Sequence, residues 1–478
     1  MKLPQGWQSV SVADVAEAMF DGPFGSALKT ADYTDHGVRV ARLENIGHLR
    51  FRDELESFVS QAKADSLRRH LLARDDVLFS SFVDQETRVC LVPQALDGRM
   101  INKADCFCVR TDRAICDARF LVYKLAAPSS YERFSGSVRG ITRPRIGLRD
   151  LAAFKIDLPP LAEQCRIVAK LDTLFACLAR ARAELERIPG LASRLRSRAV
   201  RSAFEGKLSA EWRTKHQAVG IVDEKASALP TGWRWATLGE LSDIKSGITL
   251  GKKRPVNAVL TSVPYLRVAN VQRGQLNLSV IKEIAVTQHE AESLYLRSGD
   301  ILLNEGGDRD KLGRGWVWSG EISNCIHQNH VFRARLYDKS HSPKYISFYA
   351  NEFGQDYFLE HGTQTTNLAS ISKSKLSSLP ILLAQPEEQA EIVRLLEDAF
   401  ARADRLEAEA ARARALLDRL EAAILTKAFK GELVPQDPND EPASILLERI
   451  RAQRAETPNR KQGGRSSSRR TKKLAAEV

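Results

Sequence analysis

The chain has 478 residues, 43% hydrophobic and 28% charged, which suits a folded protein with room for two or three domains. It has no apolar run of about 18 residues, and its start, MKLPQGW, has no apolar signal segment, so we expect a cytoplasmic protein without membrane spans. The net charge of +12 is weak evidence for a nucleic-acid partner, because residues 449–473 carry ten Lys or Arg and one acid.

The sequence is duplicated. Segments near the start recur in the same order about 225 residues later: LPQGW at 3–7 and LPTGW at 229–233, DVL at 76–78 and DIL at 300–302, FEGKL at 204–208 and FKGEL at 429–433. A solenoid has repeats of roughly 20–50 residues, so this period is too long for one. It indicates a whole domain plus a helix, duplicated. Two similar domains on one chain suggest a protein that reads two different things at a fixed separation.

We predict an α+β fold with two mixed α/β domains, at residues 1–158 and 229–383. Short apolar runs bounded by Gly, Asp and Pro predict strands in both domains. They lie at 77–79, 107–109 and 120–123 in the first domain and at 301–303, 331–333 and 345–348 in the second. The run at 120–123 could alternatively open a helix.

A long amphipathic helix is predicted after each domain, within residues 159–212 and 384–434. Apolar residues alternate spacings of four and three, as in the seam of a coiled coil, and the two patterns superpose at the repeat offset. The predicted seam includes Ile167, Leu171, Leu174, Leu178, Leu185, Leu195, Ile392, Leu396, Leu406, Leu417, Leu420 and Ile424. Each stripe could pack on its own domain. Because a helix of about 42 residues is roughly 60 Å long, we instead expect the two helices to pack on each other.

Proline interrupts only the first helix, where Pro189-Gly190 stands at the place of Arg414-Ala415 in the second. A proline inside a helix removes a hydrogen bond and costs on the order of 3 kcal/mol, so we predict a break near Pro189. Residues 213–228 are predicted to be a linker, 435–455 a short helical segment and 456–478 a basic disordered tail. This tail could attract phosphates or could simply be solvated.

Motifs for catalysis and for metal binding are missing. GITLGKK at 247–253 has one residue too few between its glycines for a phosphate-binding loop. There is no GxGxxG opening a helix, no HExxH, no GxSxG and no Asn-Pro-Pro-aromatic signature of an amino-methyltransferase. The seven cysteines are scattered, which favours reduced buried thiols over a zinc site. We therefore expect a chain that is not an enzyme and that binds no metal.

Polar loops recur at matched points of the two domains: 139–145 matches 362–367, and 84–88 matches 304–314. Arg, Asn, Gln, Ser and Thr can read base edges in the major groove, and basic residues can contact phosphates. The candidate DNA contacts are Lys29, Arg88, Arg139, Thr142, Arg143, Arg145, Lys252, Lys253, Arg254, Arg309, Arg314, Thr363, Gln364, Thr365 and Asn367. Any one loop could be an ordinary solvated loop. Matched positions with different side chains favour the reading of two different half-sites.

These features resemble the specificity (S) subunits of type I restriction–modification enzymes, over nearly the whole chain. The resemblance is carried by the LPxGW openings, the FEGKL and FKGEL helix exits, LPPLAEQ at 158–164 with its counterpart QPEEQ at 385–389, and DEPASILLERI at 440–450. The second copy departs from the pattern with Ala384-Gln385 where the first has Pro159-Pro160.

The resemblance implies two target-recognition domains, 1–158 and 229–383, that each read one half of a bipartite site in double-stranded DNA. It implies antiparallel helices that set the spacer and dock two methylation subunits, which carry S-adenosylmethionine. It also implies restriction subunits that use ATP and Mg²⁺, with no cofactor on this chain. The alternative is a coiled-coil adaptor whose domains bind proteins rather than DNA.

Overall fold

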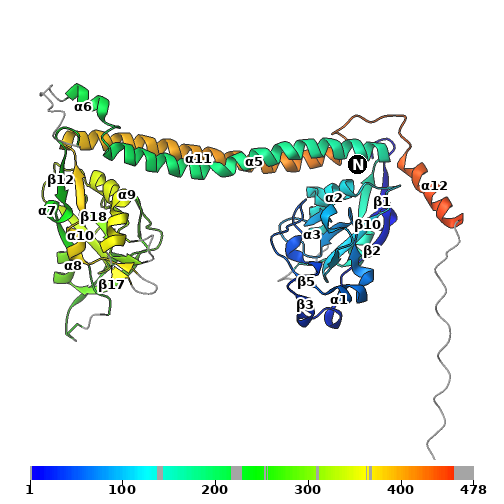
Figure 1. The fold of residues 1–478 in the computed structure, drawn as a ribbon, viewed down its shortest axis with the longest axis horizontal. Coiled ribbons are helices and arrows are strands. Elements are labelled where there is room, and N and C mark those ends of the chain that lie inside the picture. Colours follow the sequence, from blue (N-terminus) through cyan, green and yellow to red (C-terminus); the bar gives the residue numbers. More distant parts are fainter. Residues whose placement is uncertain are drawn as a thin grey trace, which may run out of the picture. The chain divides into compact units, whose positions relative to one another are not determined.

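The computed structural model describes residues 3–136, 144–216, 229–251, 254–255, 257–307, 312–361, 363–364 and 369–456. The chain divides into two compact units (Figure 1). Unit 1 contains Met1–Glu184 and Ala413–Val478, and unit 2 contains Leu185–Arg412. Each unit therefore holds one domain of the repeat and one part of each long helix. Within the described residues, no helix has the length and apolar character needed to cross a membrane.

The core of unit 1 is a four-stranded antiparallel sheet flanked by helices. Its strand order is β2 (Ala16–Phe20), β10 (Cys106–Thr111), β7 (Val77–Ser80) and β8 (Val89–Leu91). A second sheet has the order β3 (Tyr33–Thr34), β5 (Phe58–Val59), β4 (Val38–Ala41), β9 (Met100–Asn102) and β6 (Leu71–Leu72). The first strand, β1 (Gln8–Ser11), pairs antiparallel with β11 (Lys155–Leu158), the strand that precedes the long helix.

Unit 2 repeats this plan, which confirms the predicted duplication. Its four-stranded sheet has the order β13 (Ser242–Ser246), β22 (Val331–Leu336), β18 (Ile301–Asn304) and β20 (Gly315–Val317). Its other sheets are β17 (Lys282–Thr287) with β14 (Leu260–Leu266) and β21 (Ile326–His327), and β12 (Arg234–Thr237) with β25 (Pro380–Leu383). Two smaller sheets are β15 (Val271–Gln272) with β16 (Gln275–Leu276), and β19 (Gly306–Gly307) with β24 (Ala369–Ser370) and β23 (Thr363–Gln364).

Two predicted strands are helices instead. Residues 120–123 lie in α2 (Ala118–Ala126), so the alternative noted for that run is the one observed, and 345–348 lie in α9 (Pro343–His361). Asp117 caps α2, because its side chain accepts hydrogen bonds from the backbone N–H groups of Arg119 and Phe120. Both helices are buried on most faces, so their apolar runs lack the periodicity that distinguishes a helix from a buried strand.

The two long helices are α5 (Leu161–Phe204) and α11 (Pro386–Ala428), and they pack together as predicted (Figure 1). Ion pairs join Arg182 to Glu421 in unit 1 and Arg196 to Glu407 in unit 2. Residue numbers thus rise along one helix as they fall along the other, which makes the pairing antiparallel. The first helix ends at Phe204, before the predicted limit of 212, and a separate helix, α6 (Ala210–His216), follows.

The predicted break near Pro189 is wrong, because α5 is continuous through this residue. Pro189 is exposed, so water can reach the backbone where the proline removes a hydrogen bond. The segments on either side are held to α11 by Arg182 and Arg196. Packing along the whole helix therefore outweighs a local cost of about 3 kcal/mol.

The helix contact is narrower than the predicted seam. Ile167, Leu171, Leu178, Ile392, Leu396 and Ile424 are buried, and Leu174, Leu185 and Leu417 are half-buried. The assignment of Leu195, Leu406 and Leu420 to the seam is wrong, because these side chains are 40%, 48% and 48% exposed. Small residues are buried in this part of the helices instead: Ala192, Ala403 and Ala410. A contact lined by alanine covers little width, so leucines at its margin stay in water.

The C-terminal part of the chain packs on unit 1. The predicted short helical segment is α12 (Ala443–Glu456), and its Leu446 and Leu447 join the same buried cluster as Trp7. The backbone N–H of Ala443 donates to the carbonyl of Gly6, so the start of the chain and this late segment are joined directly. Residues 457–478, which include most of the predicted basic tail, lie outside the described residues.

Candidate nucleic-acid interface

The tryptophan of each LPxGW motif anchors its domain to a long helix. Trp7 donates its indole N–H to Glu163 at 3.1 Å, and Trp233 donates to Glu388 at 2.9 Å. Both glutamates lie in the first turn of their helix and are fully buried. A carboxylate at this position also interacts favourably with the helix dipole. The motif therefore has a structural role, which fixes each domain at the start of its helix.

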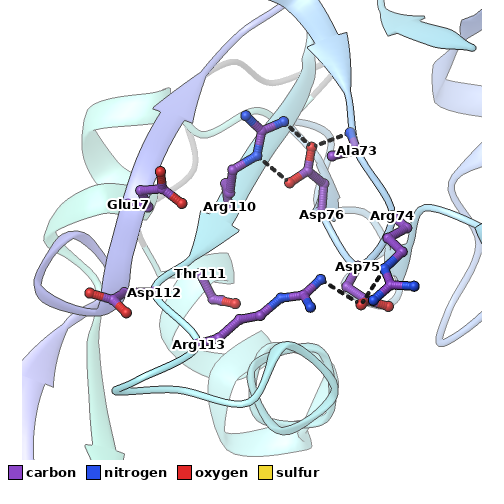
Figure 2. Close-up of a pocket in the computed structure, with 9 residues that line it drawn as sticks. All are labelled: Glu17, Ala73, Arg74, Asp75, Asp76, Arg110, Thr111, Asp112 and Arg113. Carbon is purple, nitrogen blue, oxygen red and sulfur yellow. Dashed lines mark hydrogen bonds and ion pairs between the residues drawn. The ribbon is translucent and has the colours of Figure 1, made fainter. Parts of the chain in front are cut away.

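A pocket of about 410 Å³ lies at the edge of the unit 1 sheet where β2 and β7 begin and β10 ends. Figure 2 shows Arg110 pointing at Asp76, with hydrogen bonds of 2.8 and 2.7 Å, and Arg113 reaching Asp75. The same bidentate pair recurs in unit 2 as Arg335 with Asp300. The paired charges neutralise one another and hold adjacent strands together. We therefore interpret the pocket as a structural feature of the sheet and not as a reaction site.

The described residues in and next to the predicted loops 84–88, 139–145, 304–314 and 362–367 lie at the opposite edge of each sheet. In unit 1 this is where β2 and β7 end and β8 and β10 begin; in unit 2 the corresponding strands are β13, β18, β20 and β22. We call this side the loop edge. In unit 1, Phe82 forms a β-bridge with Arg145. In unit 2, Gly306 pairs with Ser370 at the matching positions, offset by 224 and 225. Among the described residues, the structure therefore joins segments at the margins of the two predicted loops in each repeat.

The structure describes seven of the fifteen candidate DNA contacts. Arg145 is exposed and lies over the Phe82 ring at 4.3 Å, Lys29 is exposed, and Arg88 and Arg314 are half-buried. Arg254 is mostly buried and bound to Glu290 at 2.7 Å, which suits it to hold its loop rather than to contact phosphate. Thr363 and Gln364 lie in β23. The candidates outside the described residues are Arg139, Thr142, Arg143, Lys252, Lys253, Arg309, Thr365 and Asn367.

Sequence reasoning missed a matched pair of side chains at the loop edge. In unit 1, Ser81 donates to Asp105 at 3.1 Å; in unit 2, His330 and Glu305 are 2.7 Å apart. The backbone pairing is the same at this point, because Ser81 N–H donates to the Asp105 carbonyl as Glu305 N–H does to the His330 carbonyl. The two side-chain pairs thus occupy matched positions but carry different hydrogen-bonding groups. The sequence repeat could have located these positions, because Ser81 and Glu305 directly follow strands that align in the two copies.

The loop edge of unit 1 also holds acidic groups. Arg145 pairs with Asp105 at 3.4 Å. Burial raises the pKa of Asp21 to about 6, and the neighbouring Asp105 contributes to the rise. The guanidinium of Arg145 and the carboxylate of Asp105 can together donate to and accept from base edges. The chemistry offered by this surface is hydrogen-bonded recognition.

One contact ties the unit 1 loop edge to the long helices. His48 lies 3.1 Å from the Thr87 carbonyl and 3.6 Å from Glu421 of α11, which Arg182 of α5 also contacts. Burial alone would lower the pKa of His48, but Glu421, the Thr87 carbonyl and Glu86 together raise it. The loop between β7 and β8 is therefore held against the helix pair.

The described residues contain no group of three or more His, Cys, Asp or Glu placed to hold a metal ion. All seven cysteines are free thiols, and five of them are buried. Burial raises the pKa of the Cys90 thiol to about 12, so that thiol stays protonated at neutral pH.

A family model described as "Type I restriction modification DNA specificity domain" matches residues 71–189. The chain is 26% identical to the type I restriction enzyme StySPI specificity subunit of Salmonella potsdam, over 98% of this chain and 99% of that protein. It is also 26% identical to the EcoKI specificity subunit of Escherichia coli K12, with the same coverage.

Solved structures share the fold. A chain from a study titled "Structural basis underlying complex assembly and conformational transition of the type I R-M system" has a TM-score of 0.65 at 23% identity, covering 91% of this chain and 100% of that one. The HsdS subunit of Thermoanaerobacter tengcongensis has a TM-score of 0.54 at 21% identity, covering 91% and 99%. The resemblance drawn from the sequence is thereby confirmed: this chain is similar, over nearly its whole length, to the specificity subunits of type I restriction–modification enzymes.

Proposed function

We propose that this chain is the DNA-recognition subunit of a type I restriction–modification enzyme, and that each loop edge reads one half of a bipartite, gapped site. The observation that carries the proposal is the loop edge itself. The two units share a backbone hydrogen bond at matched positions of this edge, but the side chains there are Ser81 and Asp105 in one unit and Glu305 and His330 in the other. A shared scaffold with exchanged hydrogen-bonding groups is what two unlike half-sites require.

The chemistry of the two edges predicts different readings. The exposed guanidinium of Arg145 can donate two hydrogen bonds to guanine, while Glu305 can accept from the amino group of cytosine. His330 is 55% exposed and can act as donor or acceptor, depending on its protonation. The catalytic steps would belong to partners: methylation subunits with S-adenosylmethionine and restriction subunits with ATP and Mg²⁺.

The long helices would hold the two domains at a set separation and so determine the spacer. They also offer a docking surface for two identical methylation subunits. Leu191 and Leu195 of α5 are 47% and 40% exposed, and their repeat equivalents Leu416 and Leu420 of α11 are 57% and 48% exposed. A pair of exposed leucines one helical turn apart, repeated at the same offset, supports two equivalent binding faces.

The proposal is tested by mapping adenine methylation across the genome of cells that express this chain with its genomic neighbours, and again after deletion of this chain alone. We expect a two-part motif with a fixed gap that disappears on deletion. Replacing residues 1–158 with the same domain of another specificity subunit should change only one half of the motif. Methylation that persists unchanged after deletion would favour the protein-binding adaptor.

A further inference from the structure

In each unit, an arginine of α5 forms ion pairs with two acidic residues of α11. In unit 1, Arg182 contacts Glu421 at 2.6 Å and Asp418 at 2.8 Å. In unit 2, Arg196 contacts Glu407 at 2.7 Å and also contacts Asp404. The side chains of Glu421 and Arg196 are only 14% and 26% exposed, so solvent screens these pairs less than fully exposed ones.

The repeat relates the two ion pairs with their charges reversed. At the offset of 225, Arg182 corresponds to Glu407, and Arg196 corresponds to Glu421. The helix α5 therefore supplies the arginine in both places, and α11 supplies the glutamate. The net charges of the whole helices differ in the same sense. The first has nine Lys or Arg and four Asp or Glu, and the second has seven and ten, so α5 is net positive and α11 net negative.

This division makes each helix a poor partner for a second copy of itself. If another α5 took the place of α11 in unit 1, in the observed register, its Arg196 would stand where Glu421 stands, against Arg182. If another α11 replaced α5 there, its Glu407 would meet Glu421. Like charges at ion-pair distance in a partly shielded contact repel, so both self-pairs are disfavoured where the mixed pair is attracted.

We infer that the charge division selects an unlike helix as partner: the α5 surface accepts an acidic helix of the α11 type and rejects a second copy of itself. A piece of the chain with one domain and one helix would then not assemble with an identical piece, although the repeat gives both halves the same plan. The exposed leucines cannot make this distinction, because they are the same in both helices. The inference concerns pairing alone and holds whether or not the chain binds DNA.

The test starts from the folded full-length protein, which is then cut at a specific protease site placed within residues 217–228. The N fragment carries the first domain and α5, and the C fragment carries the second domain and α11. The fragments are separated in mild denaturant and allowed to reassociate, and native mass spectrometry measures mixed and self-paired species. For the wild type we expect mixed pairs only, whereas pairing without preference would place half of the fragments in self-pairs.

The decisive variant combines Arg196→Glu and Glu407→Arg with Asp404→Asn, which reverses the Arg196–Glu407 ion pair and removes the carboxylate that the new glutamate would face. The mixed pair keeps two attractive contacts. At its two ion-pair positions, each helix of this variant now carries one acidic and one basic side chain. Each self-pair therefore gains two attractive contacts as well. We expect self-paired fragments to rise from near zero toward half. The matched control adds Arg182→Glu, Glu421→Arg and Asp418→Asn. It reverses the arginine–glutamate pair in both units, restores like charges at the two positions of each helix and should again give mixed pairs only.

The packing of Leu446 and Leu447 on the first domain could also make the N fragment prefer the C fragment as its partner, independently of the ion pairs. If the variant with one reversed pair still forms only mixed pairs, that packing governs selection and the inference is wrong. Equal self-pairing in wild type and variant would also overturn it. Sedimentation of the uncut chains gives a second readout without denaturant: a concentration-dependent dimer is expected for the variant with one reversed pair, and none for the wild type or the control.

Discussion

Single residues show how the repeat divides structure from specificity. The tryptophan–glutamate and arginine–aspartate pairs are the same in both units and connect elements that must not move. Ser81 with Asp105, and Glu305 with His330, occupy one position with different chemistry. The tryptophan–glutamate pairs are buried and repeated. Among the groups that differ, Ser81 is buried, Asp105 and Glu305 are half-buried, and His330 is exposed.

The raised pKa of Asp21 predicts a pH dependence of stability. Because its folded pKa of about 6 lies above the ordinary value of 3.8, the folded protein holds this proton more tightly than the unfolded chain. The resulting stability is complete below about pH 4 and is lost as pH rises through 6. Asp21→Asn should therefore be more stable than the wild type at pH 7–8, by about 1–2 kcal/mol after allowance for partial solvation.

Denaturant unfolding of both proteins from pH 4 to 8 measures this effect. The asparagine keeps the oxygen that accepts from the Gly22 N–H, so the local turn is preserved. The control is Asp35→Asn, at an exposed carboxylate of the same domain, which should follow the wild-type profile. A wild-type profile for Asp21→Asn would show that this carboxyl is ionised throughout.

At the scale of elements, a matched pair of glycines allows two segments to cross closely. A Cβ on Gly22 would lie 2.0 Å from the carbonyl carbon of Lys103, and one on Gly247 would lie 1.9 Å from the carbonyl oxygen of His327. Neither backbone atom can move alone, so Gly22→Ala and Gly247→Ala should each cost about 2–3 kcal/mol of unfolding free energy. Gly190→Ala, at a helical position with open space around it, should instead stabilise by up to about 1 kcal/mol.

The continuity of α5 makes a prediction at Pro189. If the helix tolerates the proline only because its flanks are held to α11, Pro189→Ala restores a hydrogen bond without changing the fold. We expect the midpoint of thermal unfolding to rise, with a gain of up to about 3 kcal/mol. Arg414→Ala, at the equivalent place in α11, serves as the comparison and should have a much smaller effect. A lower midpoint for Pro189→Ala would mean that a local bend at the proline is part of the fold.

Elements were predictable where a periodic pattern was long. The duplication, two long helices and four of the six proposed strands follow from spacing alone. The two buried helices at 120–123 and 345–348 did not, because a segment that is buried on most faces has no polar side to reveal its period. The matched pairs at the loop edge were also missed, because Ser81 and Asp105 meet only through the register of β7 and β10. A sequence repeat locates such positions but does not show which of them touch.

For the whole molecule, the exposed leucines predict how many partners bind. Leu191→Glu with Leu195→Glu should remove one of two methylation subunits, and Leu416→Glu with Leu420→Glu should remove one as well, because a charge cannot enter an apolar contact without a partner. Native mass spectrometry of the purified complex counts the copies. Leu55→Glu, at a leucine that is 62% exposed in the first domain, is the control. Two copies retained by both helix variants would place the docking surface elsewhere.

The role of the helices as a spacer predicts an effect on the DNA site. One seven-residue insert after Ile188 and another after Ala413, at equivalent points of the repeat, should lengthen each helix by about 10 Å at 1.5 Å per residue. Since base pairs are about 3.4 Å apart, the methylated motif should gain about three base pairs of spacer and keep both half-sequences. An insert in one helix alone breaks the match between the seams and should reduce methylation rather than shift the spacer. If the double insert left an active enzyme with an unchanged spacer, the helices would not set the spacer.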